Sequence, residues 1–473
     1  MNRSGGWWLG LPLLLLVIAA GPLRAWQEAP AAQEPEEAQA AEEGQEPEKT
    51  LQEQVEELNQ KVRILERKDE LEKEAATEKA KTATSVTSGR DGFSIRSTDG
   101  AYQLKIRGYV QLDGRFYQND DERPANDTFI LRRVRPIFEG TVFKIFDFRI
   151  MPDFGGGTTV LQDAYIDARF SPKIKVRAGK FKPPVGLERL QSGTDILFVE
   201  RGLPTNLVPN RDLGVQLFGD LARGNVSWAV GAFNGVPDGG SGDLDNNDGK
   251  DYAARLFFQP FLADNGPWKG LGFGVAASTG DQEGTLASTS LAGYRTPGQQ
   301  TFFSYRSDGT VAGTVIADGE RFRLSPQGHL YRGPFGLLAE YAISRQEVQR
   351  AGVSAELENT SWHAEASWVF GGEPTFRAVS PKKPFDREAK TWGAFEIKAR
   401  YGRLEVDEDS FPIFANPASS AQAADEWGLG LNWYLNRNFR IYLDYERTEF
   451  EGGASAGDRE DENVLLSRFQ IAF

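Results

Sequence analysis

The 473-residue sequence contains no cysteine, only two histidines and only two methionines. Without cysteine the chain can form no disulfide bond and no thiolate metal site, which is compatible with export from the cell. The two histidines, His329 and His363, have no triad spacing around them, and no nucleophile–base pair of the kind a hydrolase needs is marked. The loop from Asp243 to Gly249 resembles a calcium loop, but its glycine comes one position late. We therefore expect no enzymatic activity, no cofactor and no bound metal.

Basic residues are outnumbered by acidic ones, 54 to 68. The net charge is −14, which argues against nucleic acid as a partner. The charge is unevenly distributed, however, because the stretch from Arg132 to Arg201 has 13 basic and 8 acidic residues. A basic patch is therefore expected within an otherwise acidic protein.

Long apolar runs are absent beyond the N-terminus. Residues 1–25 combine Arg3 with an apolar run from Trp7 to Ala20, which predicts a secretory signal peptide. Because Leu23-Arg24-Ala25 is a poor cleavage motif, a membrane anchor is the alternative. No later stretch approaches the ~20 apolar residues of a membrane-spanning helix. If the protein lies in a membrane, it must do so as a closed barrel.

Residues 26–50 are rich in Ala, Glu, Pro and Gln, which predicts a disordered acidic tether. A heptad seam follows, with valine at position a and leucine at position d, formed by Leu51, Val55, Leu58, Val62 and Leu65. It predicts a short periplasmic coiled coil over 51–81, followed by a linker over 82–92, and valine at a favours dimers. Asp69 and Glu72 occupy the next seam positions, so a solvated amphipathic helix is the alternative.

From residue 93 onward the apolar residues recur with a period of two. Phe395, Ile397 and Ala399, for example, alternate with Glu396 and Lys398. Such segments predict sixteen strands, near 103–117, 129–141, 143–153, 160–170, 173–182, 213–220, 225–234, 251–260, 270–279, 320–330, 335–346, 359–370, 391–406, 426–435, 438–449 and 464–473. The apolar faces point inward in a soluble sandwich and outward to lipid in an outer-membrane barrel. Alternation alone does not separate the two.

The connectors and the last strand favour the barrel. Very short turns, such as Ser171-Pro172 and Asn436-Arg437, alternate with long loops, as in bacterial outer-membrane barrels. One long segment, Gly371 to Lys390, falls on the short-turn side. The final strand is amphipathic and ends in Phe473, which looks like the assembly signal of such barrels. We expect an all-β fold, a 16-stranded antiparallel transmembrane β-barrel over 93–473 with an N-terminal periplasmic coiled-coil helix.

The connector over 182–212 is longer than most loops, and such length usually accompanies function or disorder. Pro183 and Pro184 end the preceding strand because they can donate no ladder hydrogen bond. The apolar residues of this loop are Leu187, Leu190, Ile196, Leu197, Phe198 and Val199. We expect the loop to fold into the bore of the barrel and to narrow a pore.

Several segments together resemble the family of phosphate-selective porins O and P. They are FILRRVRPIFEG (129–140), QDAYIDARF (162–170), RAGKFKPPVGLE (177–188), VERG (199–202), NRDLGVQL (210–217), GLGLNWYLNRNFRIYLDY (428–445) and SRFQIAF (467–473). Their order and spacing along most of 92–473 carry the resemblance. It implies a trimeric, sixteen-stranded barrel in the bacterial outer membrane, with an inward-folded third extracellular loop. It also implies outer-membrane lipid and small anions such as phosphate as partners.

The resemblance further implies a ladder of arginines toward the constriction and a basic third loop. Arginine suits oxyanions because its guanidinium is a rigid fork of donors. The residues implied to line the pore or bind anions are Arg132, Arg133, Arg189, Arg201, Asp163, Lys180 and Lys182. Three positions depart from the pattern: Thr194 replaces a loop lysine, Asp195 adds negative charge, and Tyr109 replaces a ladder arginine. Adjacent strand residues point to opposite faces, so for Arg132 and Arg133 either a bulge intervenes or one of them faces an interface.

We therefore expect an outer-membrane porin for passive diffusion of small solutes, with a preference for anions or phosphate. Three alternatives remain open. The first is a general or sugar-permeable porin, because a barrel lumen is polar in any case. The second is a structural barrel that anchors a coiled coil in contact with the cell wall, and the third is an outer-membrane hydrolase.

Overall fold

The computed structural model describes residues 50–82, 84–89, 91–245 and 247–473, without the side chains of residues 76 and 79–82. The chain divides into two compact units at Ala75–Ala76, and each is considered by itself. The predicted signal peptide over 1–25 lies outside the described residues, as does the predicted tether over 26–50 apart from Thr50.

The N-terminal helix α1 (Leu51–Thr82) begins at a capping box. The Thr50 backbone N–H donates to the Glu53 carboxylate at 2.9 Å, and the Glu53 N–H donates back to the Thr50 hydroxyl at 3.5 Å. The predicted seam is exposed along its length, with Leu51 at 81%, Leu58 at 60% and Leu65 at 63%. A helix at this position is confirmed, whereas its association into a coiled coil stays a prediction. Among the described residues, no helix is both long enough and apolar enough to cross a membrane.

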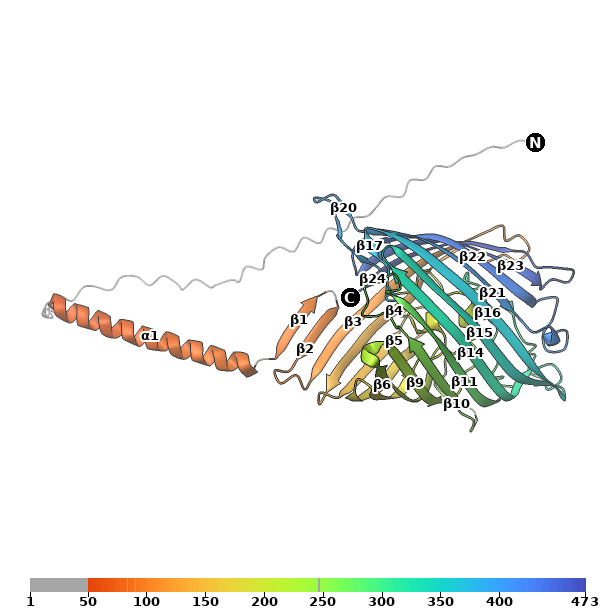
Figure 1. Cartoon of the computed structure of the whole chain (residues 1–473), viewed down its shortest axis with the longest axis horizontal. Helices are drawn as coiled ribbons and strands as arrows, with labels where there is room; N and C mark the ends of the chain where they lie inside the picture. The colour runs from red at the N-terminus through yellow and green to blue at the C-terminus, as the bar shows by residue number, and fades with distance from the viewer. Residues whose placement is uncertain (1–49, 83, 90, 246) are drawn as a thin grey trace, which may run out of the picture. The chain divides into compact units, whose positions relative to one another are not determined.

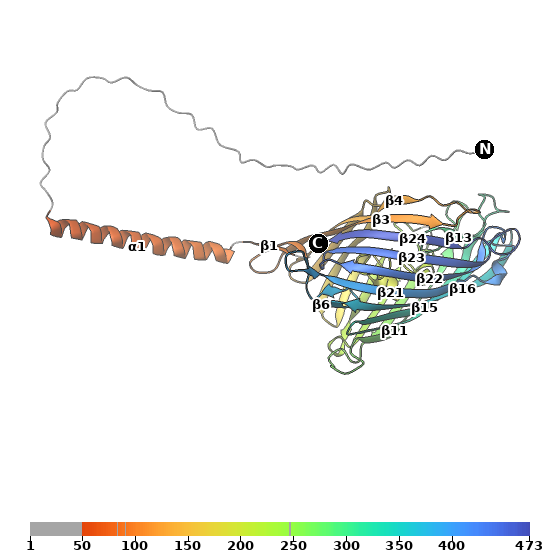
Figure 2. The same ribbon diagram turned by 90° about the horizontal axis from the view of Figure 1, so that it is seen from above.

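Sixteen strands close into an antiparallel barrel, as the sequence predicts (Figures 1 and 2). They are β3 (Gln103–Gln118), β4 (Thr128–Val142), β5 (Phe146–Asp153), β6 (Val160–Ser171), β7 (Ile174–Phe181), β8 (Asp212–Leu221), β9 (Val226–Phe233), β10 (Asp251–Phe258), β11 (Leu271–Glu283), β14 (Ile316–Arg332), β15 (Phe335–Arg350), β16 (Val353–Phe370), β21 (Ala394–Glu405), β22 (Ala421–Tyr434), β23 (Phe439–Gly452) and β24 (Glu462–Ala472). Each pairs with the next along the chain, and β24 pairs with β3 to close the ring. The closed barrel leaves no long unpaired edge.

The remaining elements are short. A hairpin of β1 (Ser85–Gly89) and β2 (Gly92–Arg96) extends the sheet, because β2 pairs with residues 103–106 of β3. The connectors contain β12 (Tyr294–Arg295), β13 (Thr301–Phe303), β17 (Gly372–Glu373), β18 (Ser380–Pro381), β19 (Phe385–Asp386), β20 (Thr391–Trp392), α2 (Leu187–Leu190), η1 (Leu203–Asn206), η2 (Ala222–Gly224) and η3 (Glu408–Ser410).

The two faces of the barrel wall differ in polarity in the sense expected for a membrane protein. On β21, Glu396, Lys398 and Arg400 face the interior and are at most 4% exposed, whereas Ile397 is 51% exposed. On β24, Phe469 likewise faces outward and is 50% exposed. Apolar side chains therefore cover the outside and polar ones fill the inside, the reverse of a soluble sandwich.

One end of the barrel, here called the long-loop end, carries most of the long connectors, and the other is the short-turn end. β15 and β16 extend beyond the expected 335–346 and 359–370 and meet in a two-residue turn at Ala351-Gly352 on the long-loop end. In the added residues the pattern of the lipid-facing wall is reversed, because Val348 and Leu357 are buried and Glu356 is exposed, so the sequence no longer reads as a strand that faces lipid. At the short-turn end the segment 371–393 folds into two small ladders, β17–β18 and β19–β20.

Candidate functional site

The connector between β7 and β8, residues 182–211, runs through the barrel interior and is bonded to the opposite wall. Strand side chains donate to its backbone oxygens: Gln111 to Gly193 at 2.8 Å, Gln470 to Thr194 at 3.3 Å, Lys398 and Asn432 to Leu197 at 2.8 and 3.0 Å, Arg400 to Glu200 at 3.0 Å, and Arg440 to Ile196. These donors belong to β3 and to β21 through β24. We call this connector the constriction loop.

Carboxylates and apolar contacts complete the attachment. Asp444 accepts from the Val199 N–H at 2.7 Å, and Glu426 accepts from the Leu203 N–H at 3.3 Å. Of the apolar loop residues named above, Leu187, Ile196, Phe198 and Val199 are at most 1% exposed. Buried backbone groups in a loop are costly unless they are paired, so polar residues from several strands are required to hold the loop inside.

A β-bulge brings Arg132 and Arg133 to the same side of β4. Gln111 of β3 pairs with Arg133, but the next residue, Leu112, pairs with Leu131, so Arg132 has no partner in the register. A bulge of this kind re-aims a side chain. Both guanidinium groups consequently face the carboxylate of Glu200 in the constriction loop. Arg132 contacts it through Nε at 2.5 Å and through Nη2 at 3.2 Å, and Arg133 Nη2 lies 3.7 Å away. Of the two explanations considered for this pair, the bulge is the one found.

Glu200 is shared among four arginines. Besides Arg132 and Arg133, Arg115 lies 3.3 Å and Arg468 lies 3.8 Å from its Oε1. Burial by itself raises the pKa of Glu200, but the charges of these arginines outweigh that effect and hold the pKa well below its usual value. Arg132 and Arg133 are therefore partly neutralised by the loop that they hold.

Three other cations of the loop have no such neutralisation. Within the described residues, no carboxylate oxygen lies within 4.0 Å of the charged nitrogens of Lys182, Arg189 or Arg201. They donate to backbone oxygens instead: Lys182 and Arg201 to Gln191 at 2.7 and 2.8 Å, and Arg189 to Thr205. We call Lys182, Arg189 and Arg201 the loop cations.

The arginines around the loop cations, Arg135 and Arg149 on the barrel wall and Arg211 at the end of the loop, are paired with aspartates. Arg135 donates to Asp153 at 2.7 Å, and Arg211 donates to Asp163 at 2.8 Å. Asp163 also lies 3.3 Å from Arg149. The predicted acidic residue of the narrow region is thus held between two arginines.

Lys180, near the end of β7, differs from Lys182, the first residue of the constriction loop. Its side chain is 5% exposed and its ammonium pairs with Asp243, in the connector between β9 and β10. It does not line the cavity that the loop cations line. Lys180 therefore lies apart from Arg132, Arg133, Lys182, Arg189 and Arg201, which all line that cavity.

Two cavities lie on either side of the constriction loop. The one toward the long-loop end has a volume of about 570 Å³ and is lined by the three loop cations together with Arg133, Arg135 and Arg211. The one toward the short-turn end has a volume of about 700 Å³, and its lining includes Gln191, Ser192, Thr194, Asp195 and Tyr109. The constriction loop contributes residues to the lining of both cavities.

The three departures from the family pattern all lie on the short-turn side. Thr194 donates to Asp195 at 2.9 Å, and the Tyr109 hydroxyl accepts from Arg135 at 2.8 Å. Arg135, Arg149 and Arg211 were not singled out from the sequence. Arg135 shares a strand face with Arg133 two residues before it, which is a usable signal, whereas the position of Arg211 becomes evident only from the folded loop.

The chain matches the family model of the phosphate-selective porins O and P over residues 104–473. It is 22% identical over 430 residues to Porin O of Pseudomonas aeruginosa, covering 84% of this chain and 96% of that protein. The fold is similar to the outer membrane channel DcaP of Acinetobacter baumannii, with a TM-score of 0.51 and 10% identity, covering 80% of this chain and 99% of that one. It is also similar to the anion-selective porin from Comamonas acidovorans, with a TM-score of 0.48 and 12% identity, covering 79% and 100%. Because the family model covers most of the chain, this protein belongs to the family of phosphate-selective porins O and P and is a porin of the outer membrane.

Proposed function

We propose that this porin lets small anions, phosphate among them, diffuse passively across the outer membrane, and that the loop cations are the principal anion contact. The observation that supports this most directly is their lack of a nearby carboxylate. Lys182, Arg189 and Arg201 line one cavity and have no carboxylate partner within ion-pair distance in the described part of the chain. An anion in that cavity supplies the missing negative charge.

The arrangement also fits passage rather than permanent capture. An oxyanion that enters a narrow lumen loses water and needs other donors, which guanidinium and ammonium groups provide. The loop cations already donate to backbone oxygens, so an anion replaces weak neutral acceptors and can leave again. Arg133, Arg135 and Arg211 line the same cavity and offer further positions, and several moderate sites conduct better than one tight site.

Phosphate binding is expected to be moderate, because Thr194 and Asp195 line the cavity on the short-turn side and Asp195 repels a divalent anion. The lining of the same cavity also includes Arg107, Arg149, Arg377, Arg437 and Arg440, so this side still admits anions. We infer that the protein acts as a channel and not as an enzyme, in keeping with its family.

The test is a planar bilayer recording of the full-length porin. Under a chloride gradient the reversal potential is expected to show preference for anions, and graded phosphate is expected to reduce the chloride current in a saturable way. An anion preference without any effect of phosphate on the chloride current would contradict phosphate binding and identify a general anion porin. Equal permeability to cations and anions would contradict the proposal and favour the general or sugar-permeable porin.

We also propose a homotrimer, as the family resemblance implies, with α1 of each chain contributing to the assembly. The apolar seam of α1 is exposed in the single chain, and burying it requires a partner. Mass measurement of the detergent-solubilised protein is expected to give three copies, and deletion of residues 51–81 is expected to reduce the stability of the trimer without changing conductance. If the deletion instead abolishes attachment of the outer membrane to the cell wall and leaves the trimer unaffected, the helix is a tether.

A further inference from the structure

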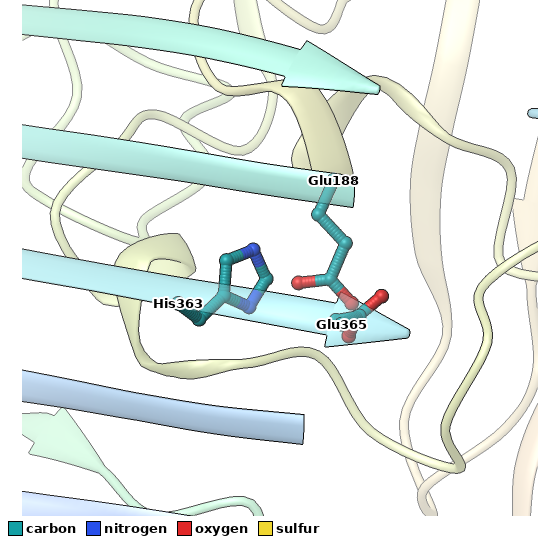
Figure 3. A group of neighbouring side chains, drawn as sticks. All are labelled: Glu188, His363 and Glu365. Carbon is teal, nitrogen blue, oxygen red and sulfur yellow. The ribbon is translucent and has the colours of Figure 1, made fainter. Parts of the chain in front are cut away.

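A second cluster of charged residues lies where the constriction loop meets the wall at β15 and β16. Glu188 comes from the loop, and His363 and Glu365 come from the same face of β16. One ligand-capable atom of each lies within 4.8 Å of those of the other two. Figure 3 shows the edge of the His363 ring turned toward the two carboxylates.

The polar atoms of this cluster are buried and incompletely bonded. His363 is 1% exposed and Glu188 is fully buried. Neither ring nitrogen of His363 has a hydrogen-bond partner in the structure, and the Oε1 atoms of Glu188 and Glu340 have none either. Glu340, which faces His363 across the β15–β16 pairing, has its Oε1 3.5 Å from His363 Nε2. Buried polar groups of native proteins are nearly always paired, so these atoms point to a missing partner.

Carboxylates are concentrated around the cluster. Five buried ones gather here, those of Glu188, Glu340, Glu365, Glu426 and Glu446. Arg400 is divided among Glu365 at 3.3 Å, Glu426 at 3.3 Å and Glu446 at 3.0 Å. Within the described residues, no lysine or arginine nitrogen lies within 4.0 Å of the Glu188 or Glu340 carboxylate, and Arg201 and Arg400 act on Glu188 only from beyond that distance. Buried carboxylates of this kind are usually paired or bound to a metal.

We propose that Glu188, His363 and Glu365 bind one zinc-like divalent transition metal ion, with Glu340 or water as a fourth ligand. An imidazole with two carboxylates is a donor set that suits Zn²⁺, whereas Ca²⁺ and Mg²⁺ prefer oxygen ligands alone. The two glutamates on flexible side chains need to move only slightly to reach metal-ligand distance. A small cavity of about 20 Å³ adjoins Glu365.

The backbone at Gly202 packs closely against the cluster. A side chain there would overlap the His363 ring nitrogen Nδ1, so only glycine lets the loop approach the ring this closely. The Gly202 N–H donates to Glu188 Oε2 at 3.0 Å and orients that carboxylate from behind. The metal would join α2 of the constriction loop to the barrel wall, and so would act as a clamp on the loop that carries Arg189 and Arg201. This site stands independently of the anion proposal, because its ligands are not the loop cations.

The test is zinc binding by the full-length, tag-free porin in detergent after removal of metals by chelation. We expect one Zn²⁺ per chain by elemental analysis and calorimetry, and the absorption spectrum of a tetrahedral site when Co²⁺ replaces Zn²⁺. His363→Ala and Glu188→Gln are each expected to weaken zinc binding at least about tenfold, as for the loss of a metal-ligating or ligand-orienting group. Chloride conductance through the wild-type pore tests the anion proposal separately, so failure of one proposal can be told from failure of the other.

The other histidine provides a matched control. His329 lies among aromatic rings, with centroids of Phe257 and Phe376 at 5.4 and 5.2 Å, and is not part of the cluster. His329→Ala is expected to bind zinc as the wild type does. Absence of stoichiometric zinc, tighter binding of Ca²⁺ than of Zn²⁺, or equal losses in the His363 and His329 variants would overturn the proposal. Because Glu188→Gln preserves side-chain volume, it tests the site even if His363→Ala does not fold.

Discussion

Lys182 and Arg201 donate to the same acceptor, the backbone oxygen of Gln191, at 2.7 and 2.8 Å. Two positive charges therefore meet at one neutral oxygen. A carbonyl dipole compensates two charges only weakly, and like charges in a site of low dielectric raise each other's energy. We therefore expect an anion to bind most favourably beside these two cations of the constriction loop, because it would relieve their mutual repulsion.

Replacement of Arg201 by alanine is expected to move the reversal potential under a chloride gradient toward zero, because one of three uncompensated charges is lost. It is also expected to weaken phosphate block roughly tenfold, the effect of losing one charge-assisted contact of about 1.5 kcal/mol. The control is Arg345→Ala, which removes an equal charge from a side chain paired with Glu358 away from the cavity. Similar shifts in both variants would show that net charge, and not the site, sets selectivity.

Lys180 and Lys182 are expected to differ in their contribution to selectivity. Lys180 is neutralised by Asp243, whereas Lys182 has no carboxylate partner within the described residues. Lys182→Ala should therefore reduce anion preference, and Lys180→Ala should reduce it little. The reversal potentials of the two variants, measured under the same chloride gradient, test this difference. A larger change in the Lys180 variant would contradict the neutralisation of Lys180 by Asp243.

Anion preference is expected to fall at alkaline pH because of Lys182. Burial and the nearby charges of Arg201 and Arg211 hold the pKa of Lys182 well below its usual value. As the pH rises through that lowered pKa, the lysine becomes neutral and one positive charge disappears from the site. Reversal potentials measured from neutral pH upward should thus decline below the ordinary lysine pKa of about 10.4.

Lys182→Arg serves as the control for that titration, since arginine keeps its charge over the same range. Its reversal potential should stay constant while that of the wild type declines. A wild type that is insensitive to pH, or an arginine variant that declines equally, would rule out Lys182 as the titrating group.

Glu200→Gln is expected to destabilise the folded porin by roughly 3–5 kcal/mol, the usual cost of removing one partner from a buried ion pair. The change leaves Arg132 and Arg133 facing an uncharged amide and loosens the loop. Thermal unfolding in detergent measures the loss. Glu358→Gln makes the same chemical change at a carboxylate that is 39% exposed and paired with Arg345, and should cost less than about 1 kcal/mol.

Gly193→Ala is expected to lower single-channel conductance. A methyl group at this position would lie 3.2 Å from Arg133 Cδ and 3.3 Å from the Tyr109 hydroxyl oxygen, so these side chains or the loop must shift at the narrow part of the path. Gly266→Ala adds the same group where nothing lies within 4 Å and should leave conductance unchanged. A wild-type conductance in the Gly193 variant would mean that the solute path does not pass this contact.

Much of the barrel could be predicted because lipid constrains every strand in the same local way. Each spanning segment must expose apolar residues on alternate positions, as Phe395 and Ile397 do, so the period is readable without knowing the neighbours. Where the wall leaves the lipid, as at the turn between β15 and β16, this constraint ends and the predicted strands stop too early.

The charged residues behave differently. Their types and approximate positions are evident in the sequence, and Arg189 and Arg201 were placed in the loop before any fold was known. Which of them are neutralised depends on carboxylates far away along the chain: Lys180 meets Asp243, and Arg132 reaches Glu200 only because a bulge turns it inward.

The sequence by itself thus determined the number and polarity of the strands, the existence of the long loop, and the basic character of its surroundings, since all of these follow from local period and composition. Only the tertiary structure decided which cations stay unpaired and which acidic residues crowd around His363. The physical reason is that ion pairing acts over a few ångströms in space, and closing a barrel brings together side chains that are hundreds of residues apart.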